Sequence, residues 1–122
     1  MQTIYLAPAQ PGYGMDLCLD SSGNIALASE PYSLAQDAAS ACKTFLNECY
    51  YDTTLGVPYF QQILGQNPPL ELIRSQLVAQ CLTVPDVIAA QVFFSSFANR
   101  SLVGQIQMTN TAGVISAAGI TV

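Results

Sequence analysis

The chain has 122 residues, with eight acidic and three basic side chains and a net charge of −5. This length fits one domain with a modest core, and the lack of a basic surface excludes nucleic acid as a partner. Histidine is absent, which excludes catalysis by a serine or cysteine nucleophile paired with histidine. No apolar run approaches the roughly 18 residues of a membrane-spanning helix.

The surface is expected to be unusually poor in charge. Only 9% of the residues are charged, whereas globular chains average roughly 25%. We therefore expect partner proteins to cover part of the surface. The N-terminus lacks the basic and apolar segments of a signal peptide, so we expect a soluble protein made in the cytoplasm of its producing cell, without membrane contact. The four cysteines lack the C-x-x-C spacing of zinc sites, and we predict neither a metal nor a cofactor.

The beginning of the chain divides into an arm and a hairpin. Residues 1–14 are rich in proline and glycine and predict an N-terminal arm that becomes ordered on contact with a partner. Residues 15–122 are predicted to form a single domain. Within it, apolar residues alternate on both sides of the turn sequence 21–24, which predicts a β-hairpin with one apolar face.

Two helices are predicted from residues that recur at three- and four-residue steps. Ser33 suits the N-cap of the first helix, Gln36 completes a capping box, and the helix is expected to continue to about Tyr51. The second helix is expected to begin at Asn67 as its N-cap and to end before Pro85.

After the second helix the apolar period changes from 3.6 to two. Strands are predicted over residues 87–97, 102–109 and 114–122. The fold class is therefore α+β, a small mixed or antiparallel sheet packed against two main helices, with the N-terminal hairpin. The last strand carries no charge, so its edge would promote aggregation unless the chain or a partner strand covers it.

The segment between the helices is acidic and aromatic. Glu48 and Asp52 are a possible acid pair of a cell-wall hydrolase. The alternative is a loop fixed by aromatic packing and hydrogen bonds. Nothing in the sequence places the two carboxylates in a common cleft, and we favour the structural interpretation.

An ordered set of short motifs gives a more specific lead. The sequences NIAL at 24–27, LNE at 46–48 followed by Tyr51-Asp52, and GVPY at 56–59 occur in this order around the first helix. From Asp16 to Thr109 the chain resembles the baseplate wedge, or sheath-initiator, family of contractile tails, which includes gene-25-like, protein W-like and TssE-like proteins. It departs from the family where Asn47 replaces a frequent glycine, and where Val84-Pro85-Asp86 replaces Glu-Pro-Arg.

The resemblance implies a structural protein of the virion, in the tail baseplate, and not an enzyme. Such proteins start the contractile sheath by presenting strands that interlace with extended arms of sheath subunits. The implied partners are the sheath protein, other baseplate wedge proteins and the tail tube or hub. The alternatives are a component of a type VI secretion-like injection system and the cell-wall hydrolase.

The resemblance also suggests which residues make these contacts. Residues 87–109 would carry the sheet that accepts sheath strands, and 48–59 would form a baseplate docking loop. The sheath-facing residues are expected to be Val92, Phe94, Leu102, Val103, Gln105, Gln107 and Thr109. The docking residues are expected to be Glu48, Tyr51, Asp52, Gly56, Pro58 and Tyr59, and Val84, Pro85 and Asp86 remain from the family signature.

Overall fold

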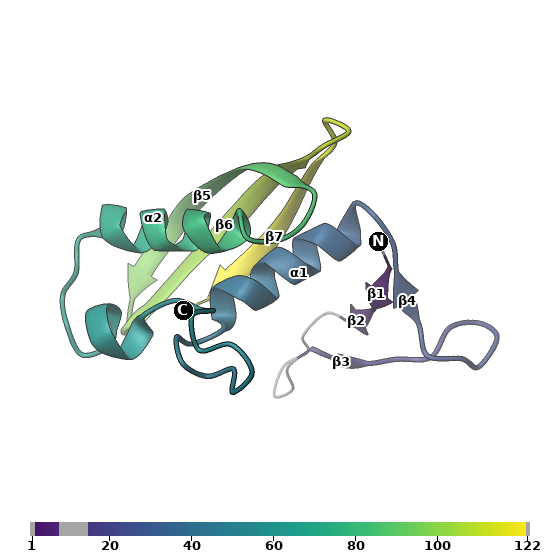
Figure 1. Cartoon of the computed structure of the whole chain (residues 1–122), viewed down its shortest axis with the longest axis horizontal. Helices are drawn as coiled ribbons and strands as arrows, with labels where there is room; N and C mark the ends of the chain where they lie inside the picture. Colours follow the sequence, from purple (N-terminus) through teal and green to yellow (C-terminus); the bar gives the residue numbers. More distant parts are fainter. Residues whose placement is uncertain (1, 8–14, 122) are drawn as a thin grey trace.

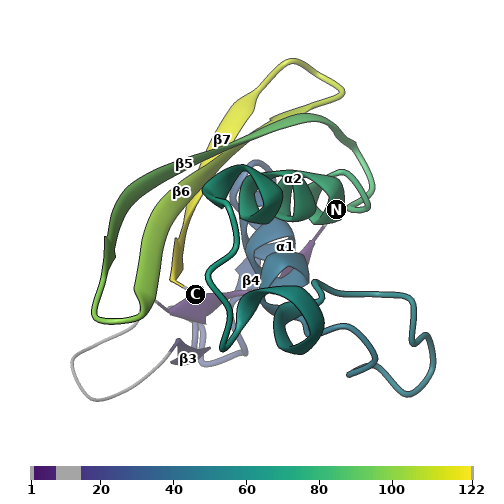
Figure 2. The same cartoon turned by 90° about the vertical axis from the view of Figure 1, so that its left-hand side faces the viewer.

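A three-stranded antiparallel sheet and the helices on one of its faces make up most of the molecule (Figure 1). The computed structural model describes residues 2–7 and 15–121. The sheet has the order β5-β6-β7, and α1 and α2 lie on the same side of it (Figure 2). The bounds are Val87–Ala98 for β5, Ser101–Asn110 for β6, Ile115–Thr121 for β7, Tyr32–Lys43 for α1 and Leu70–Cys81 for α2. The predicted α+β class is confirmed.

Alternation along β6 divides its side chains between a buried face and an outward face. Leu102, Ile106 and Met108 point toward the helices and are buried. In register, Ile106 pairs with Val92 of β5 on one side and with Ala118 of β7 on the other. The helices divide the sheet between them, since α1 packs against β6 and β7 whereas α2 packs against β5.

The turns of the sheet form where the sequence predicts them. Asn99 and Arg100 both have positive φ values, 52° and 62°, as a two-residue hairpin turn of type I′ requires. At the next turn the side chain of Asn110 accepts hydrogen bonds from the backbone N–H groups of Ala112 and Val114. The adjacent Gly113 has φ +80°, which only glycine adopts without strain.

The predicted capping of α1 is wrong. The helix begins at Tyr32 after Pro31, and no side chain caps it. Gln36 instead donates from its side-chain Nε2 to the backbone carbonyl of Ile4 at 2.7 Å and accepts from the N–H of Leu6 at 3.1 Å. Both the side-chain oxygen and the side-chain nitrogen of Gln36 are thus bonded to the N-terminal strands, whereas a capping box would need this side chain at the first turn of α1.

The predicted end of α1 is also wrong, because the helix stops at Lys43 rather than near Tyr51. Phe45 forms a parallel bridge with Val57, and Thr44 accepts a hydrogen bond from the Val57 N–H at 2.9 Å. Pairing with a segment twelve residues further along the chain replaces the next helical turn. Cys49 therefore lies outside the helix, whereas Cys42 stays inside it.

The start of α2 lies later than predicted. Asn67 is not its N-cap; Pro69 takes that position and Leu70 is the first helical residue. The cause is the Pro-Pro pair, because a residue that precedes proline avoids the helical conformation, which keeps Pro68 out of the helix. A short π-helical turn, η1 (Tyr59–Ile63), precedes this segment.

Short strand pairs form the N-terminal part. β1 (Thr3–Ile4) pairs with β4 (Leu27–Ala28), and β2 (Leu6–Ala7) pairs with β3 (Asp16–Leu17). A bridge between Leu19 and Ile25 closes the predicted hairpin. Residues 3–4 and 6–7 of the expected arm are thus in strands, and its residues 1 and 8–14 lie outside the described part of the chain.

Candidate interaction surfaces

The face of the sheet that points away from the helices is uncharged. The sequence from 87 to 122 contains one charged residue, Arg100, which lies in a turn. Apolar side chains such as Phe93 and Ile115 are 48% and 68% exposed there. In register, Gln91, Gln107 and Ala117 form one row across the three strands. This face offers amide and apolar groups to a partner but almost no charge.

The residues expected to face the sheath fall into two sets. Val103 and Gln105 are exposed on the outward face of β6, where Gln107 and Thr109 are half-buried. Val92 and Leu102 are in the core, at 3% and 4% exposure. Phe94 is half-buried beneath the guanidinium of Arg74, 5.3 Å from its ring centroid.

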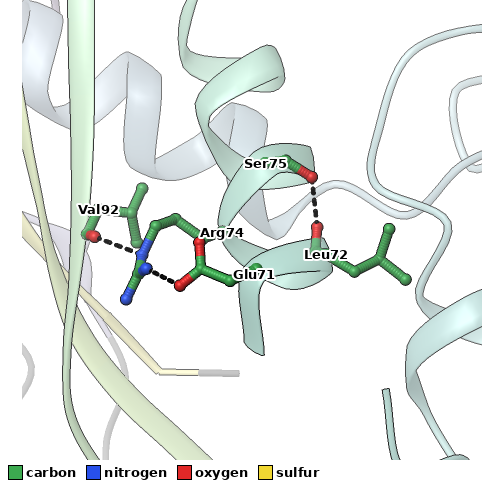
Figure 3. A network of polar contacts seen from close by, with 5 residues as sticks. All are labelled: Glu71, Leu72, Arg74, Ser75 and Val92. Atoms are coloured by element: carbon green, nitrogen blue, oxygen red, sulfur yellow. Dashed lines mark hydrogen bonds and ion pairs between the residues drawn. The ribbon is translucent and has the colours of Figure 1, made fainter. Parts of the chain in front are cut away.

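The central strand β6 cannot accept another strand, because it already pairs with β5 and β7. A partner strand can therefore pair only with the backbone of an edge strand, β5 or β7. At the β5 edge, Nε of Arg74 donates a hydrogen bond to the Val92 carbonyl at 3.1 Å (Figure 3). Register shifts at Val87/Ala89 and Phe94/Ser96 also make this strand irregular. Both features obstruct strand addition at β5.

The backbone of the predicted docking loop is held against the end of α1. Gly56 has φ +108°, and a Cβ atom there would lie 2.6 Å from the carbonyl carbon and oxygen of Phe45. Asn47, which departs from the family glycine, has φ 70°. Asparagine is enriched in this left-handed conformation, so the departure preserves the backbone geometry that glycine would provide.

The two carboxylates of the loop are engaged in local hydrogen bonds. Glu48 accepts from the backbone N–H of Phe45 at 2.8 Å. Asp52 accepts from the hydroxyl and backbone N–H of Thr54 at 2.6 and 3.0 Å, which lowers the pKa of Asp52. The general acid of a glycosidase needs a raised pKa. The Asp52 carboxyl is shifted in the opposite direction, and both groups stabilise the loop.

The aromatic side chains of the loop divide into a buried anchor and an exposed tip. The Tyr59 hydroxyl donates to the Cys42 carbonyl inside the core, and burial raises the pKa of Tyr59. Pro58 precedes it and is the N-cap of η1. Tyr50 and Tyr51 are 93% and 72% exposed, with their rings edge to face at 5.4 Å. Tyr50 was missing from the predicted docking residues, although its place beside Tyr51 could have suggested it.

The structure brings the docking loop together with the remnant of the family signature. Tyr51 and Gly56 of the loop line a hollow of about 360 Å³ together with Val84 and Pro85. Asp86, with φ 70°, makes the tight corner from α2 into β5 and accepts a hydrogen bond from the Thr111 N–H.

Neither a metal-binding cluster nor a membrane-spanning helix occurs among the described residues. Within residues 2–7 and 15–121, no group of three or more His, Cys, Asp or Glu side chains could hold a metal ion. Over the same ranges, α-helices fall short of the length and apolar character needed to cross a membrane.

An open antiparallel sheet with helices on one face and an attached loop defines a scaffold of the α+β class. The chain belongs to the family of contractile injection system sheath initiators, whose model matches residues 13–113. This confirms the resemblance seen in the sequence motifs and gives the chain a baseplate role in such a system.

The fold also occurs in a solved structure. A protein from Geobacter sulfurreducens, described as a "putative tail lysozyme", superposes with a TM-score of 0.63 at 12% identity. The match covers 80% of this chain and 93% of the other, and at this identity it shows a shared fold alone. A comparison with curated proteins finds no significant match.

Proposed function

We propose that the protein initiates sheath assembly by accepting an extended strand of a sheath subunit at its three-stranded sheet. The observation that carries this proposal is the open, nearly uncharged sheet β5-β6-β7, whose outer face has no cover among the described residues. Strand addition supplies affinity through backbone hydrogen bonds, and outward side chains such as Val103 and Gln105 add specificity. No catalytic residue is needed, and the role is structural.

We place the protein in the tail baseplate of a virion, where the loop 48–59 docks to other wedge proteins or to the tube or hub. Support comes from the exposed Tyr50–Tyr51 pair, because aromatic side chains are enriched at protein interfaces. The loop lies on the helix side of the molecule, away from the outer face of the sheet (Figure 2). The same architecture would serve a type VI secretion-like apparatus, and neighbouring genes distinguish the two.

The test is reconstitution of sheath growth on purified baseplates that lack this chain. Adding the chain should restore sheaths of uniform length attached at the baseplate, counted by electron microscopy. Equal numbers of attached sheaths without the chain would contradict the proposal. Release of labelled peptidoglycan by the purified chain, lost in Glu48→Gln with the fold retained, would favour the hydrolase instead.

A further inference from the structure

The edge of β7 differs from the edge of β5 in two features that matter for strand addition, a regular ladder and the absence, among the described residues, of a side-chain contact to its backbone like that of Arg74 with β5. β7 pairs with β6 without interruption from Ile115 to Thr121 and contains no charged residue. Its other edge is unpaired within the described part of the chain. By contrast, Arg74 contacts the β5 edge through Val92.

The hydrogen-bond phase of β7 identifies which of its groups are available. The Asn110 N–H bonds to the Val114 carbonyl at 3.0 Å, and pairs alternate along an antiparallel ladder. Ser116, Ala118 and Ile120 therefore bond to β6. The backbone groups of the alternate residues, such as Ala117 and Gly119, lie in the plane of the sheet and point away from β6, at the open edge. They offer a row of donors and acceptors to an added strand.

A groove accompanies this edge. It has a volume of about 470 Å³ and lies between β7, α1 and the N-terminal strands. Its lining from α1 includes two small residues, Ala35 and Ala39, beside longer ones such as Gln36, and Leu6 of β2 lines it as well. An extended segment could pair with β7 here and place small apolar side chains against the helix.

The groove also carries a charge that limits its occupant. Lys43, the last residue of α1, lines it together with Thr121 at the end of β7. Within the described residues the Lys43 ammonium has no ion pair. A second copy of the chain would bring its own uncharged β7, whereas an acidic residue on a different partner would complement Lys43.

We infer that β7 is the edge that receives the sheath segment, in the groove against α1, with an acidic residue of that segment paired to Lys43. This inference rests on the proposed function and adds the edge, the flanking groove and the charge of the partner. It also explains the bare β7 edge, which as a permanent surface would promote aggregation.

Hydrogen exchange on the chain with and without purified sheath subunits tests the edge. The outward amides of Ala117 and Gly119 should become protected when the sheath subunit binds. The outward amides of β5, at Ala90 and Phe94, should keep their exchange rates. Binding with protection at β5 alone would overturn the edge assignment and leave the proposed function intact, whereas absence of any binding would remove both.

Three variants complete the test. Ala117→Pro removes an outward N–H without breaking the ladder with β6, and should weaken sheath binding at least about tenfold. Ala112→Ser, at an exposed turn residue that does not line the groove, is the control and should bind as the parent does. Lys43→Glu should weaken binding about fivefold at low salt, with a smaller effect at high salt. Unchanged binding by Ala117→Pro, or β7 protection in the chain alone that sheath subunits do not alter, would overturn the inference.

Discussion

Gly56 is the residue whose replacement should be most costly for the docking loop. Gly56→Ala would hold alanine at φ +108° and bring its Cβ against the Phe45 carbonyl. We expect a loss of about 3 kcal/mol in the free energy of unfolding, measured by urea denaturation. Gly65→Ala is the matched control, since its φ is +73° but the added Cβ meets open space, and should cost about 1 kcal/mol. Equal losses would show that the Phe45 contact is unimportant.

The buried Tyr59 hydroxyl should make stability depend on alkaline pH. Its pKa is raised from 10.0 in the folded protein by burial, so the unfolded chain loses its proton first as the pH rises. The contribution is fully present below pH 10 and declines above it. In urea titrations between pH 8 and 11, the stability of the parent should therefore fall more steeply than that of Tyr59→Phe.

The same variant has a second effect at neutral pH. Tyr59→Phe leaves the buried Cys42 carbonyl without the hydroxyl donor and should cost about 1–2 kcal/mol. Tyr50→Phe, at a fully exposed ring, should change stability very little. Parallel pH profiles for the parent and Tyr59→Phe would rule out the proposed role of burial.

Single residues show what the sequence could predict at this scale. Positive φ values at Gly56 and Asn47 fit their residue types, because glycine and asparagine adopt this conformation more readily than other residues. The role of Gln36 was not visible, because its partners Ile4 and Leu6 lie about thirty residues earlier in the chain. A local capping motif competes with such long-range contacts, and here the contacts with the N-terminal strands prevail.

One side chain of α2, Arg74, contacts the backbone at the open edge of β5. Arg74→Ala removes the hydrogen bond to the Val92 carbonyl and the contact with the Phe94 ring. We expect a loss of about 1 kcal/mol and increased self-association of the exposed edge, measured by sedimentation velocity. Glu71→Gln is the control, because its exposed pair with Arg74 should contribute less than about 0.5 kcal/mol. Association that rises equally in Glu71→Gln would contradict a specific role of the Val92 contact.

The contact between α1 and α2 includes a pair of buried thiols. The sulfurs of Cys42 and Cys81 lie 3.4 Å apart, and their hydrogen bond and burial raise the pKa of Cys42. In the native protein a maleimide should label Cys18 and Cys49, which are partly exposed, much faster than this pair. All four should react after unfolding. Rapid native labelling of Cys42 would show that the helices separate readily.

The predicted elements were accurate where their signal is local. Alternation in β6 predicted that its side chains divide between two faces, and the turn residues marked the strand ends, but the predicted sheath-facing set mixed the two faces, because it included the buried Leu102 beside the exposed Val103. The end of α1 was not predictable, because it depends on the pairing of Phe45 with Val57 across a loop. The open sheet was predicted as a candidate interface, but the choice between its edges needed the position of Arg74.

The whole molecule separates its two candidate surfaces. The outer face and the β7 edge belong to the sheet, whereas the Tyr50–Tyr51 tip lies on the helix side (Figure 2). The core between them contains Leu34 and Leu77 at 0% exposure and holds the two surfaces in a fixed relation. A scaffold of this kind can bind a baseplate with one side while the other receives the first sheath subunits.

This separation predicts two variants with complementary defects. Replacing Tyr50 and Tyr51 together by serine should abolish incorporation into baseplates while leaving binding to free sheath subunits unchanged, because neither ring contributes to the sheet. Ala117→Pro should enter baseplates normally and fail to start sheaths. Both can be followed by co-sedimentation with baseplates and by affinity measurements with sheath subunits. If the double serine variant lost sheath binding as well, with its fold retained, the loop and the sheet would act as one surface.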